Sequence, residues 1–203
     1  MHTQTKDTQL ALTPQSVLEM MKEGNQRFLS KSLANRDLHQ QVKDTSKGQY
    51  PMAVVLSCID SRVPVEIVFD KGIGDIFSAR VAGNIVNEDV LGSIEYSCKV
   101  AGSKVVMVLG HTKCGAVTAA CKHVELGNIT ALLSKIKPAV DSLVKPDVEL
   151  TSEVIEDVVV LNVKNAIDQI RVDSPILKEM EDNGEIYIVG AVYDVSNGEV
   201  NYL

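Results

Sequence analysis

The chain has 203 residues, of which 45% are hydrophobic and 23% charged, a composition typical of a folded globular protein. Twenty basic and 27 acidic residues leave a net charge of −7, which argues against nucleic acid or an anionic membrane as partner, because both attract basic surfaces. Only 4% of the residues are aromatic and none is Trp, so stacking platforms for bases or sugars are not expected. No apolar stretch reaches 18 residues, so the sequence predicts no membrane span.

In chain order, the pattern begins with a polar, aperiodic stretch over 1–12, which we expect to be loose. Thr13-Pro14 is typical of a helix start and predicts a helix over about 14–30. Continuous apolar runs, typical of strands buried on both faces, follow at Ala53–Ile59, Ile76–Ala82 and Lys104–Leu109. Helical patterns are found at 88–101, 115–125, Ile129–Val144 and Ser152–Val172, and an acidic, Pro-containing turn around Lys145-Pro146-Asp147 is expected between the last two. The ending, Glu185–Asp194, Asn197-Gly198 and Glu199–Leu203, is typical of a hairpin.

Alternating strands and helices predict an α/β fold, with a parallel-core β-sheet flanked by helices, an extending N-terminal helix and a C-terminal hairpin-like segment. Neither a Pro/Ser-rich linker nor an internal repeat interrupts the chain, so we expect a single domain over 1–203. Lys71-Gly72-Ile73-Gly74-Asp75 contains Gly-x-Gly, but it lacks the third glycine of a dinucleotide site and precedes a strand. This segment therefore predicts a turn.

Four cysteines, at 58, 98, 114 and 121, are too few and too irregularly spaced for the disulfide framework of a small secreted protein. They favour a reducing compartment, so we expect a cytoplasmic protein, while a leader cleaved before residue 1 would leave no trace in this numbering. Cys98 and Cys121 fall within predicted helices and are interpreted as buried apolar thiols.

Two polar clusters lie where predicted strands end. Cys58-Ile59-Asp60-Ser61-Arg62 leaves the strand that starts at Ala53, and Gly110-His111-Thr112-Lys113-Cys114-Gly115 leaves the strand that starts at Lys104. If the two strands are neighbours, Cys58, His111 and Cys114 converge at one edge of the sheet. Two thiolates and one imidazole are ligands that Zn²⁺ selects, and three protein ligands leave a fourth position open, as in catalytic zinc sites. A lone His-x-x-Cys is a weak signal, and an Asp60–Arg62 pair is also compatible with a surface ion pair.

Three motifs, however, occur together in a specific order and spacing. Cys58-Ile59-Asp60-Ser61-Arg62-Val63-Pro64 is followed by Arg80-Val81-Ala82-Gly83-Asn84 and then by the cluster over 110–115. In this combination the chain resembles the β-class carbonic anhydrases, from about Gly48 to Ala120.

The resemblance implies that Cys58, His111 and Cys114 bind zinc and that Asp60 and Arg62 form a catalytic dyad. The implied reaction is the reversible hydration of carbon dioxide to bicarbonate and a proton, by attack of zinc-bound hydroxide that the dyad orients. In some members the aspartate instead occupies the fourth zinc position at lower pH.

The resemblance also implies a substrate pocket of the open kind, with Gln49, Phe77 and Tyr96 reaching in from a partner subunit and Gly83 and Asn84 at the rim. By the same resemblance, members with the closed kind of pocket would have a Trp at the position of Val55 in this chain. A homodimer, or a tetramer formed by two such dimers, is therefore expected, with the N-terminal helix and the apolar segment Ile186–Val192 as candidate interface elements. Arg80 is expected to pair structurally or to help hold bicarbonate.

Two alternatives stay open. In the first, the zinc site is the same but the substrate is carbonyl sulfide or carbon disulfide, linear electrophiles that β-class relatives also hydrolyse. The second is a zinc or thiol module without catalytic activity, in which Cys58 and Cys114 form a redox switch that controls partner binding. This alternative would leave the Asp60–Arg62 pair without a role.

Overall fold

The computed structural model describes residues 3–146 and 149–203. The N-terminal half contains α1 (Lys6–Leu10), α2 (Pro14–Leu29), α3 (Leu38–Thr45), β1 (Ala53–Ser57), α4 (Val65–Val68), β2 (Ile76–Arg80), the 3₁₀ turn η1 (Ala82–Asn84), α5 (Glu88–Glu95) and the π-helical turn η2 (Tyr96–Val100). It is followed by β3 (Val105–His111), α6 (Gly115–Cys121), α7 (Gly127–Leu133), α8 (Lys137–Leu143), α9 (Ser152–Asp173), α10 (Pro175–Asp182), β4 (Tyr187–Tyr193) and β5 (Val200–Tyr202).

The five strands form one sheet in the order β2-β1-β3-β4-β5. The first four strands are parallel, and β5 pairs antiparallel with β4. The predicted α/β class, the parallel core and the C-terminal hairpin are confirmed.

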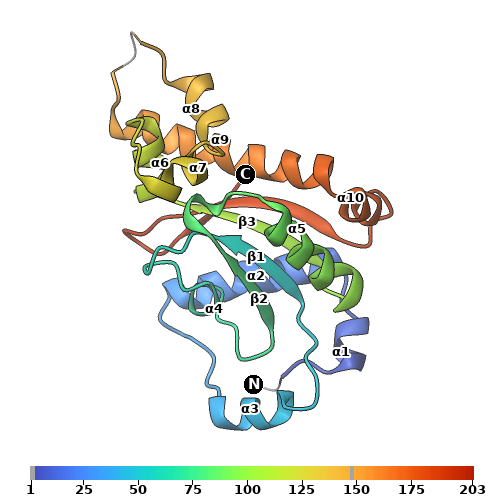
Figure 1. Ribbon diagram of the computed structural model, residues 1–203. Helices are drawn as coiled ribbons and strands as arrows, with labels where there is room; N and C mark the ends of the chain where they lie inside the picture. Colours follow the sequence, from blue (N-terminus) through green and yellow to red (C-terminus); the bar gives the residue numbers. More distant parts are fainter. Residues whose placement is uncertain (1–2, 147–148) are drawn as a thin grey trace.

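Helices lie on both faces of the sheet (Figure 1). Because side chains alternate along the strands, the core has two layers, one on each face. Val54 and Leu56 of β1 pack on the face covered by α6, α8, α9 and α10. Ala53 and Val55 pack on the opposite face, with α2 and α4. All of β1 and β3 is buried, which explains why these strands are continuous apolar runs.

The N-terminal segment differs from its prediction. Residues 6–10 form α1, which has a Thr5–Thr8 capping box, and Gln9 is buried and donates hydrogen bonds to the carbonyls of Pro51 and Ala101. The expectation of a loose segment over 1–12 is therefore wrong for these residues, because a side-chain amide satisfies two carbonyls of the core.

Three other helices differ from the sequence pattern. The polar stretch after α2 contains α3, which Asp37 caps. The helix predicted over Ile129–Val144 is divided into α7 and α8, because Pro138 has no N–H to donate to the carbonyl of Ser134. The short helix α10 was not predicted, although Ser174 caps it and Pro175 begins it.

The proposed interface role of Ile186–Val192 is wrong. Most of this segment lies in β4, an interior strand between β3 and β5, and Ile188 and Ala191 are buried. Except for Tyr187, which is exposed, and Val189, which is partly buried, its apolar side chains fill the core and are not available to a partner chain.

Residue 147, in the turn predicted around Lys145-Pro146-Asp147, lies outside the described residues. Within those residues, no helix combines the length and the apolar character needed to cross a bilayer.

Candidate metal centre and active site

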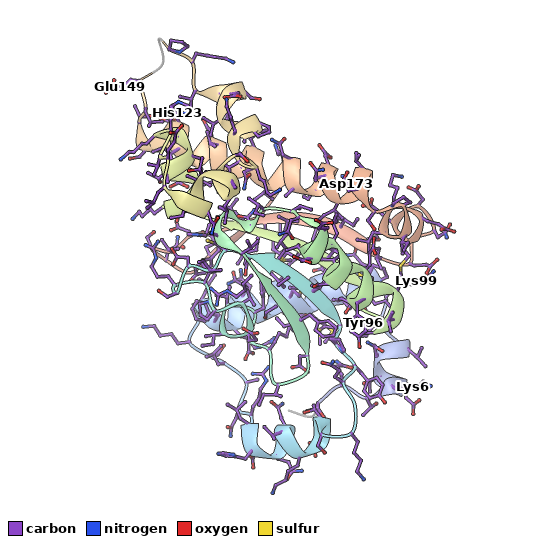
Figure 2. All side chains as sticks on the ribbon, in the orientation of Figure 1. Lys6, Tyr96, Lys99, His123, Glu149 and Asp173 are labelled. Atoms are coloured by element: carbon purple, nitrogen blue, oxygen red, sulfur yellow. The ribbon has the colours of Figure 1, made fainter. Side chains whose placement is uncertain are left out.

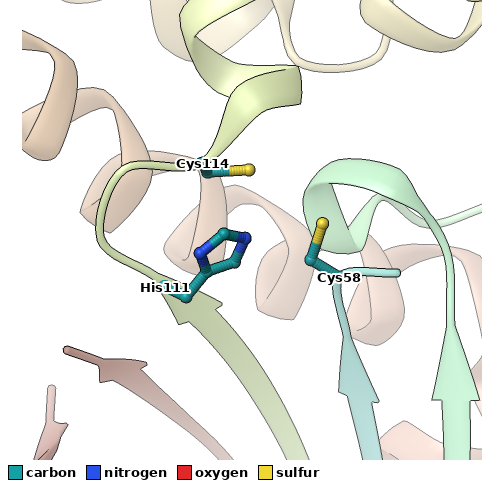
Figure 3. A group of neighbouring side chains, drawn as sticks. All are labelled: Cys58, His111 and Cys114. Atoms are coloured by element: carbon teal, nitrogen blue, oxygen red, sulfur yellow. The ribbon is translucent and has the colours of Figure 1, made fainter. Parts of the chain in front are cut away.

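The two predicted clusters meet because β1 and β3 are parallel neighbours, with Ser57 opposite Leu109. Cys58 follows the last residue of β1, His111 is the last residue of β3, and Cys114 is the N-cap of α6. Their donor atoms all lie within 4.8 Å of one another, and all three residues are buried (Figure 3).

The position of Cys58 is fixed from two sides. The Gly83 N–H donates to Sγ of Cys58 at 3.3 Å, and Arg80 Nε donates to the Cys58 carbonyl at 3.0 Å. Arg80 Nη2 also donates to the Asp60 carbonyl at 2.6 Å, so Arg80 holds the loop that joins the two residues. Gly83 has a φ of 69°, and an added Cβ would lie 2.6 Å from Cδ1 of Ile136, so this turn requires glycine.

The imidazole of His111 is oriented by the backbone. Nδ1 lies 2.9 Å from the Thr112 carbonyl, which can only accept a hydrogen bond, so Nδ1 carries the proton. In the neutral imidazole the other nitrogen, Nε2, then has a free lone pair. It is buried and has no hydrogen-bond partner among the described residues. A buried acceptor without a hydrogen-bond partner lowers the stability of the folded protein, because it has lost its bonds to water. A metal ion bound to Nε2 would satisfy it.

The three groups strongly perturb one another's protonation. The neighbouring Cys114 and His111 outweigh burial and hold the pKa of Cys58 well below its usual range. The same contact with Cys58, together with burial, raises the pKa of Cys114. Burial opposes an imidazolium, but the adjoining Cys58 raises the pKa of His111 overall. Without a metal, the cluster therefore retains protons that a metal would displace.

This donor set fits zinc. Thiolates and an imidazole are its preferred ligands, and in the described part of the chain no further Cys or His joins the cluster. Structural zinc sites are closed by four such ligands, whereas three leave a position for solvent or substrate.

Asp60 and Arg62 lie beside this centre as a bidentate ion pair. Arg62 Nε and Nη2 donate to the two carboxylate oxygens at 2.9 and 2.8 Å, and the Arg62 backbone N–H adds a third bond at 2.9 Å. These bonds hold the pKa of Asp60 well below its usual range. Asp60 Oδ2 lies 3.9 Å from His111 Nε2, so the ionised carboxylate faces the donor cluster.

The structure separates the other predicted site residues into two groups. Gly83 and Asn84 lie in η1, beside Cys58, and both are buried. Phe77 and Tyr96 contact each other edge to face with ring centroids 6.3 Å apart, and they line a groove of about 580 Å³. Phe77 pairs with Val54, toward the other end of the sheet, and the exposed Gln49 precedes β1 at that end. Figure 2 likewise shows Tyr96 far from His123, which follows α6.

Two polar residues that contact the centre were not identified from the sequence. Glu156 accepts a hydrogen bond from the Lys113 N–H, and Asn162 donates to the Gly83 carbonyl. Asn162 stands within the apolar run Val158-Val159-Val160-Leu161 and Val163, and a polar residue in such a run was a usable signal. Glu156 has no comparable signature.

Comparisons with known proteins agree with this geometry. Residues 53–200 match the family described as carbonic anhydrase. "Carbonic anhydrase 2" of Mycobacterium tuberculosis is 34% identical over 200 residues, covering 91% of this chain and 90% of the relative.

Two solved structures have the same fold. A β-carbonic anhydrase of Aspergillus fumigatus is 25% identical with a TM-score of 0.73, covering 93% of this chain and 89% of that one. A tetrameric β-carbonic anhydrase of Sordaria macrospora is 23% identical with a TM-score of 0.73, covering 81% of this chain and 88% of that one. The matched residues include the whole Cys-His-Cys cluster and the Asp60–Arg62 pair. This chain therefore belongs to the carbonic anhydrase family, in its β class.

Proposed function

We propose that the chain catalyses the reversible hydration of carbon dioxide to bicarbonate and a proton, with one zinc ion held by Cys58, His111 and Cys114. The observation that carries the proposal is the buried, partnerless Nε2 of His111, close to two thiols and to an ionised carboxylate. Bound zinc would act as a Lewis acid and lower the pKa of water toward neutrality.

Asp60 is the residue that orients the reacting water. Its carboxylate is ionised, and Arg62 donates hydrogen bonds to both oxygens from one side. Oδ2, the oxygen near His111 Nε2, can still accept a hydrogen bond from water. That bond would fix the direction in which the water oxygen presents its lone pair to carbon dioxide. Lys could not replace Arg62, because the two parallel N–H donors hold both carboxylate oxygens at once.

The three bonds from Arg62 also support an open state. For Asp60 to become a fourth ligand, the carboxylate would have to leave the bidentate pair and the bond from the Arg62 N–H. We propose that Asp60 stays on Arg62 at neutral pH and that the fourth position belongs to water.

Thiolate ligands make water harder to acidify than imidazole ligands, since they donate more charge. The Gly83 N–H bonded to Cys58 Sγ and the helix N-terminus at Cys114 both withdraw some of that charge. In this way η1 and α6 partly offset the cost of a two-thiolate site.

We further propose that the substrate pocket is completed by a second copy of the chain. Gln49, Phe77 and Tyr96 lie at the opposite end of the sheet from Cys58, so they can contribute only to the pocket of a partner. The tetrameric relative from Sordaria macrospora supports a homo-oligomer of this kind. The four free cysteines favour the cytoplasm, and we regard residues 1–203 as one functional domain.

The test combines zinc analysis with carbon dioxide hydration followed by a pH indicator. We expect about one zinc per chain in the wild type, and in Asp60→Asn a loss of about 100- to 1,000-fold in kcat with zinc retained. Carbonyl sulfide and carbon disulfide are assayed in parallel, because faster turnover of either would assign a different substrate. Absence of hydration together with a Cys58–Cys114 disulfide would instead support the redox switch.

A further inference from the structure

Helix α9 contacts both loops that carry the three metal-binding side chains. It reaches one loop through Glu156 and the other through Asn162. Neither residue is a donor of the cluster, and neither contacts Asp60 or Arg62 in a bond found among the described residues. Their role therefore has to be sought in what they do to the two loops.

Glu156 acts on the His111–Cys114 loop at Lys113. Lys113 adopts the left-handed conformation, with a φ of 56°, which is disfavoured for a residue that has a side chain. Glu156 Oε1 accepts its N–H at 2.8 Å, and Arg62 Nη2 donates to its carbonyl at 3.3 Å. The peptide units on both sides of Lys113 are thus held, one by α9 and the other by the arginine of the Asp60 pair.

Asn162 acts on the turn that supports Cys58. Its Nδ2 donates to the Gly83 carbonyl at 2.9 Å, and the Gly83 N–H donates to Cys58 Sγ at 3.3 Å. Asn162 is only 4% exposed, so water cannot readily replace this bond. If the Asn162 side chain moved, Gly83 would therefore move with it, and the hydrogen bond from the Gly83 N–H to Cys58 Sγ would change.

The backbone of β3 brings α9 close enough for both contacts. A Cβ added to Gly110 would lie 2.6 Å from Cγ2 of Val163 and 3.2 Å from Cγ1 of Val159. Because residue 110, directly before His111, is glycine, α9 can pack closely against β3 at this point. This contact fixes the distance between the helix and the metal-binding edge of the sheet.

We propose that Glu156 and Asn162 are positioning residues that hold the metal ligands in place, so that α9 sets how tightly the site retains zinc. The inference rests on the proposed function, because it assumes that the cluster binds zinc. Partners that orient metal ligands typically change metal affinity by about 10- to 100-fold when they are removed. The expected effect is therefore on metal retention first and on turnover only as a consequence.

The experiment measures the rate at which the zinc-loaded protein loses zinc to an excess of a coloured chelator. We expect Glu156→Ala and Asn162→Leu each to lose zinc about 10-fold faster than the wild type or more. Glu156→Gln keeps an oxygen that can accept the Lys113 N–H, so it should stay within about 3-fold of the wild type. The visible absorption of the cobalt-loaded proteins should change in the first two variants only, since it reports ligand geometry.

Matched controls lie on the same helix. Glu153→Ala removes an exposed carboxylate one turn earlier, and Asn165→Leu removes an amide one turn after Asn162. Both should lose zinc at the wild-type rate. If Glu156→Ala does not fold, as judged by circular dichroism, the Asn162 and Asn165 pair decides by the same criterion.

The proposal is overturned if Glu156→Ala and Asn162→Leu release zinc no faster than their controls. It is also overturned if Glu156→Gln is as defective as Glu156→Ala, because the charge and not the hydrogen bond would then matter. A wild-type chain that takes up no zinc contradicts the proposed function, whereas normal retention in the variants contradicts only the role of α9.

Discussion

The two ends of β1 differ in how much of the active site a single chain supplies. At the carboxyl end, Cys58 already lies beside the donors from β3 and α6, and every group that orients it belongs to the same chain. At the amino end, Gln49 and Tyr96 are exposed, and Phe77 lies four residues, or about 13 Å of strand, from the level of Cys58.

Under the proposed function, folding of one chain completes the metal centre but not the substrate pocket. Metal ligands need fixed positions, and a strand end backed by a buried sheet supplies them. Of the proposed pocket side chains, Phe77 lies on the edge strand β2 and Tyr96 on the exposed start of η2, where a second chain can cover them. Metal binding and oligomerisation should therefore be separable by mutation.

The largest expected effect comes from breaking the metal end. Cys114→Ala should lose its zinc and slow carbon dioxide hydration by about 1,000-fold or more, because both the Lewis acid and its water are lost. Metal analysis and the indicator assay measure this. Cys121→Ala, which removes another buried thiol at the end of the same helix, is the control and should keep both properties. Full zinc content in Cys114→Ala would contradict the assigned ligand set.

A second prediction tests whether the fold depends on ion pairs outside the metal centre. Asp70 is buried and pairs with Arg27, at 2.5 Å, and with Arg36. Asp70→Asn leaves the arginines with an uncompensated charge, so the free energy of unfolding at pH 7 should fall by about 3 kcal/mol. Urea unfolding measures it, and Asp141→Asn, in an exposed pair, should cost less than about 1 kcal/mol.

The pH dependence of this difference follows from the direction of the shift. Burial alone would raise the pKa of Asp70, but its two arginines and the Ala34 N–H lower it overall. A carboxyl whose pKa is lowered on folding stabilises the protein above the unfolded pKa, about 3.9, and loses that contribution as the pH falls further. The difference between wild type and Asp70→Asn should therefore shrink below about pH 4. A difference that grows there would contradict this account.

The smallest expected effect tests the amino end. Gln49→Ala should lower kcat/KM by about 10-fold, the effect of one lost hydrogen bond to substrate, without loss of zinc. Mixing it with inactive Cys58→Ala under conditions of subunit exchange should restore about a quarter of wild-type activity, because mixed dimers contain one complete site.

Without sharing of residues, the same mixture should keep only about a twentieth of wild-type activity, since half the chains lack the metal and the rest lack Gln49. If the subunits are shown to exchange, that result would mean that Gln49 does not contribute to the partner's pocket. It would not contradict the assignment of the three zinc ligands.

The metal centre could be predicted from the sequence because strand ends determine where it lies. Cys58 and His111 lie at the carboxyl ends of two predicted strands, and the rule that ligands bind beyond the carboxyl ends of parallel strands placed them together. Parallel pairing of β1 with β3 was the one condition that the sequence left open, and the structure meets it.

Other features depended on contacts that no local pattern encodes. Gln9 stabilises α1 by bonding carbonyls more than 40 residues away in sequence, so α1 could not be predicted from the polar residues around it. The apolar segment Ile186–Val192 was compatible with an interface and with an interior strand, and only its pairing with β3 distinguishes these. Glu156 resembles any exposed helical carboxylate until the Lys113 loop is placed against it. By contrast, Ser174-Pro175 carried the same signal as Thr13-Pro14 and should have predicted α10.

The most direct test of the central claim is an anomalous diffraction map at the zinc absorption edge, from reduced protein crystallised at pH 8. We predict about one zinc per chain, bound to the two sulfurs and to Nε2 of His111, with a solvent oxygen in the fourth position and Asp60 still on Arg62. No zinc between these three side chains, or Asp60 or another side chain in the fourth position, would contradict the account.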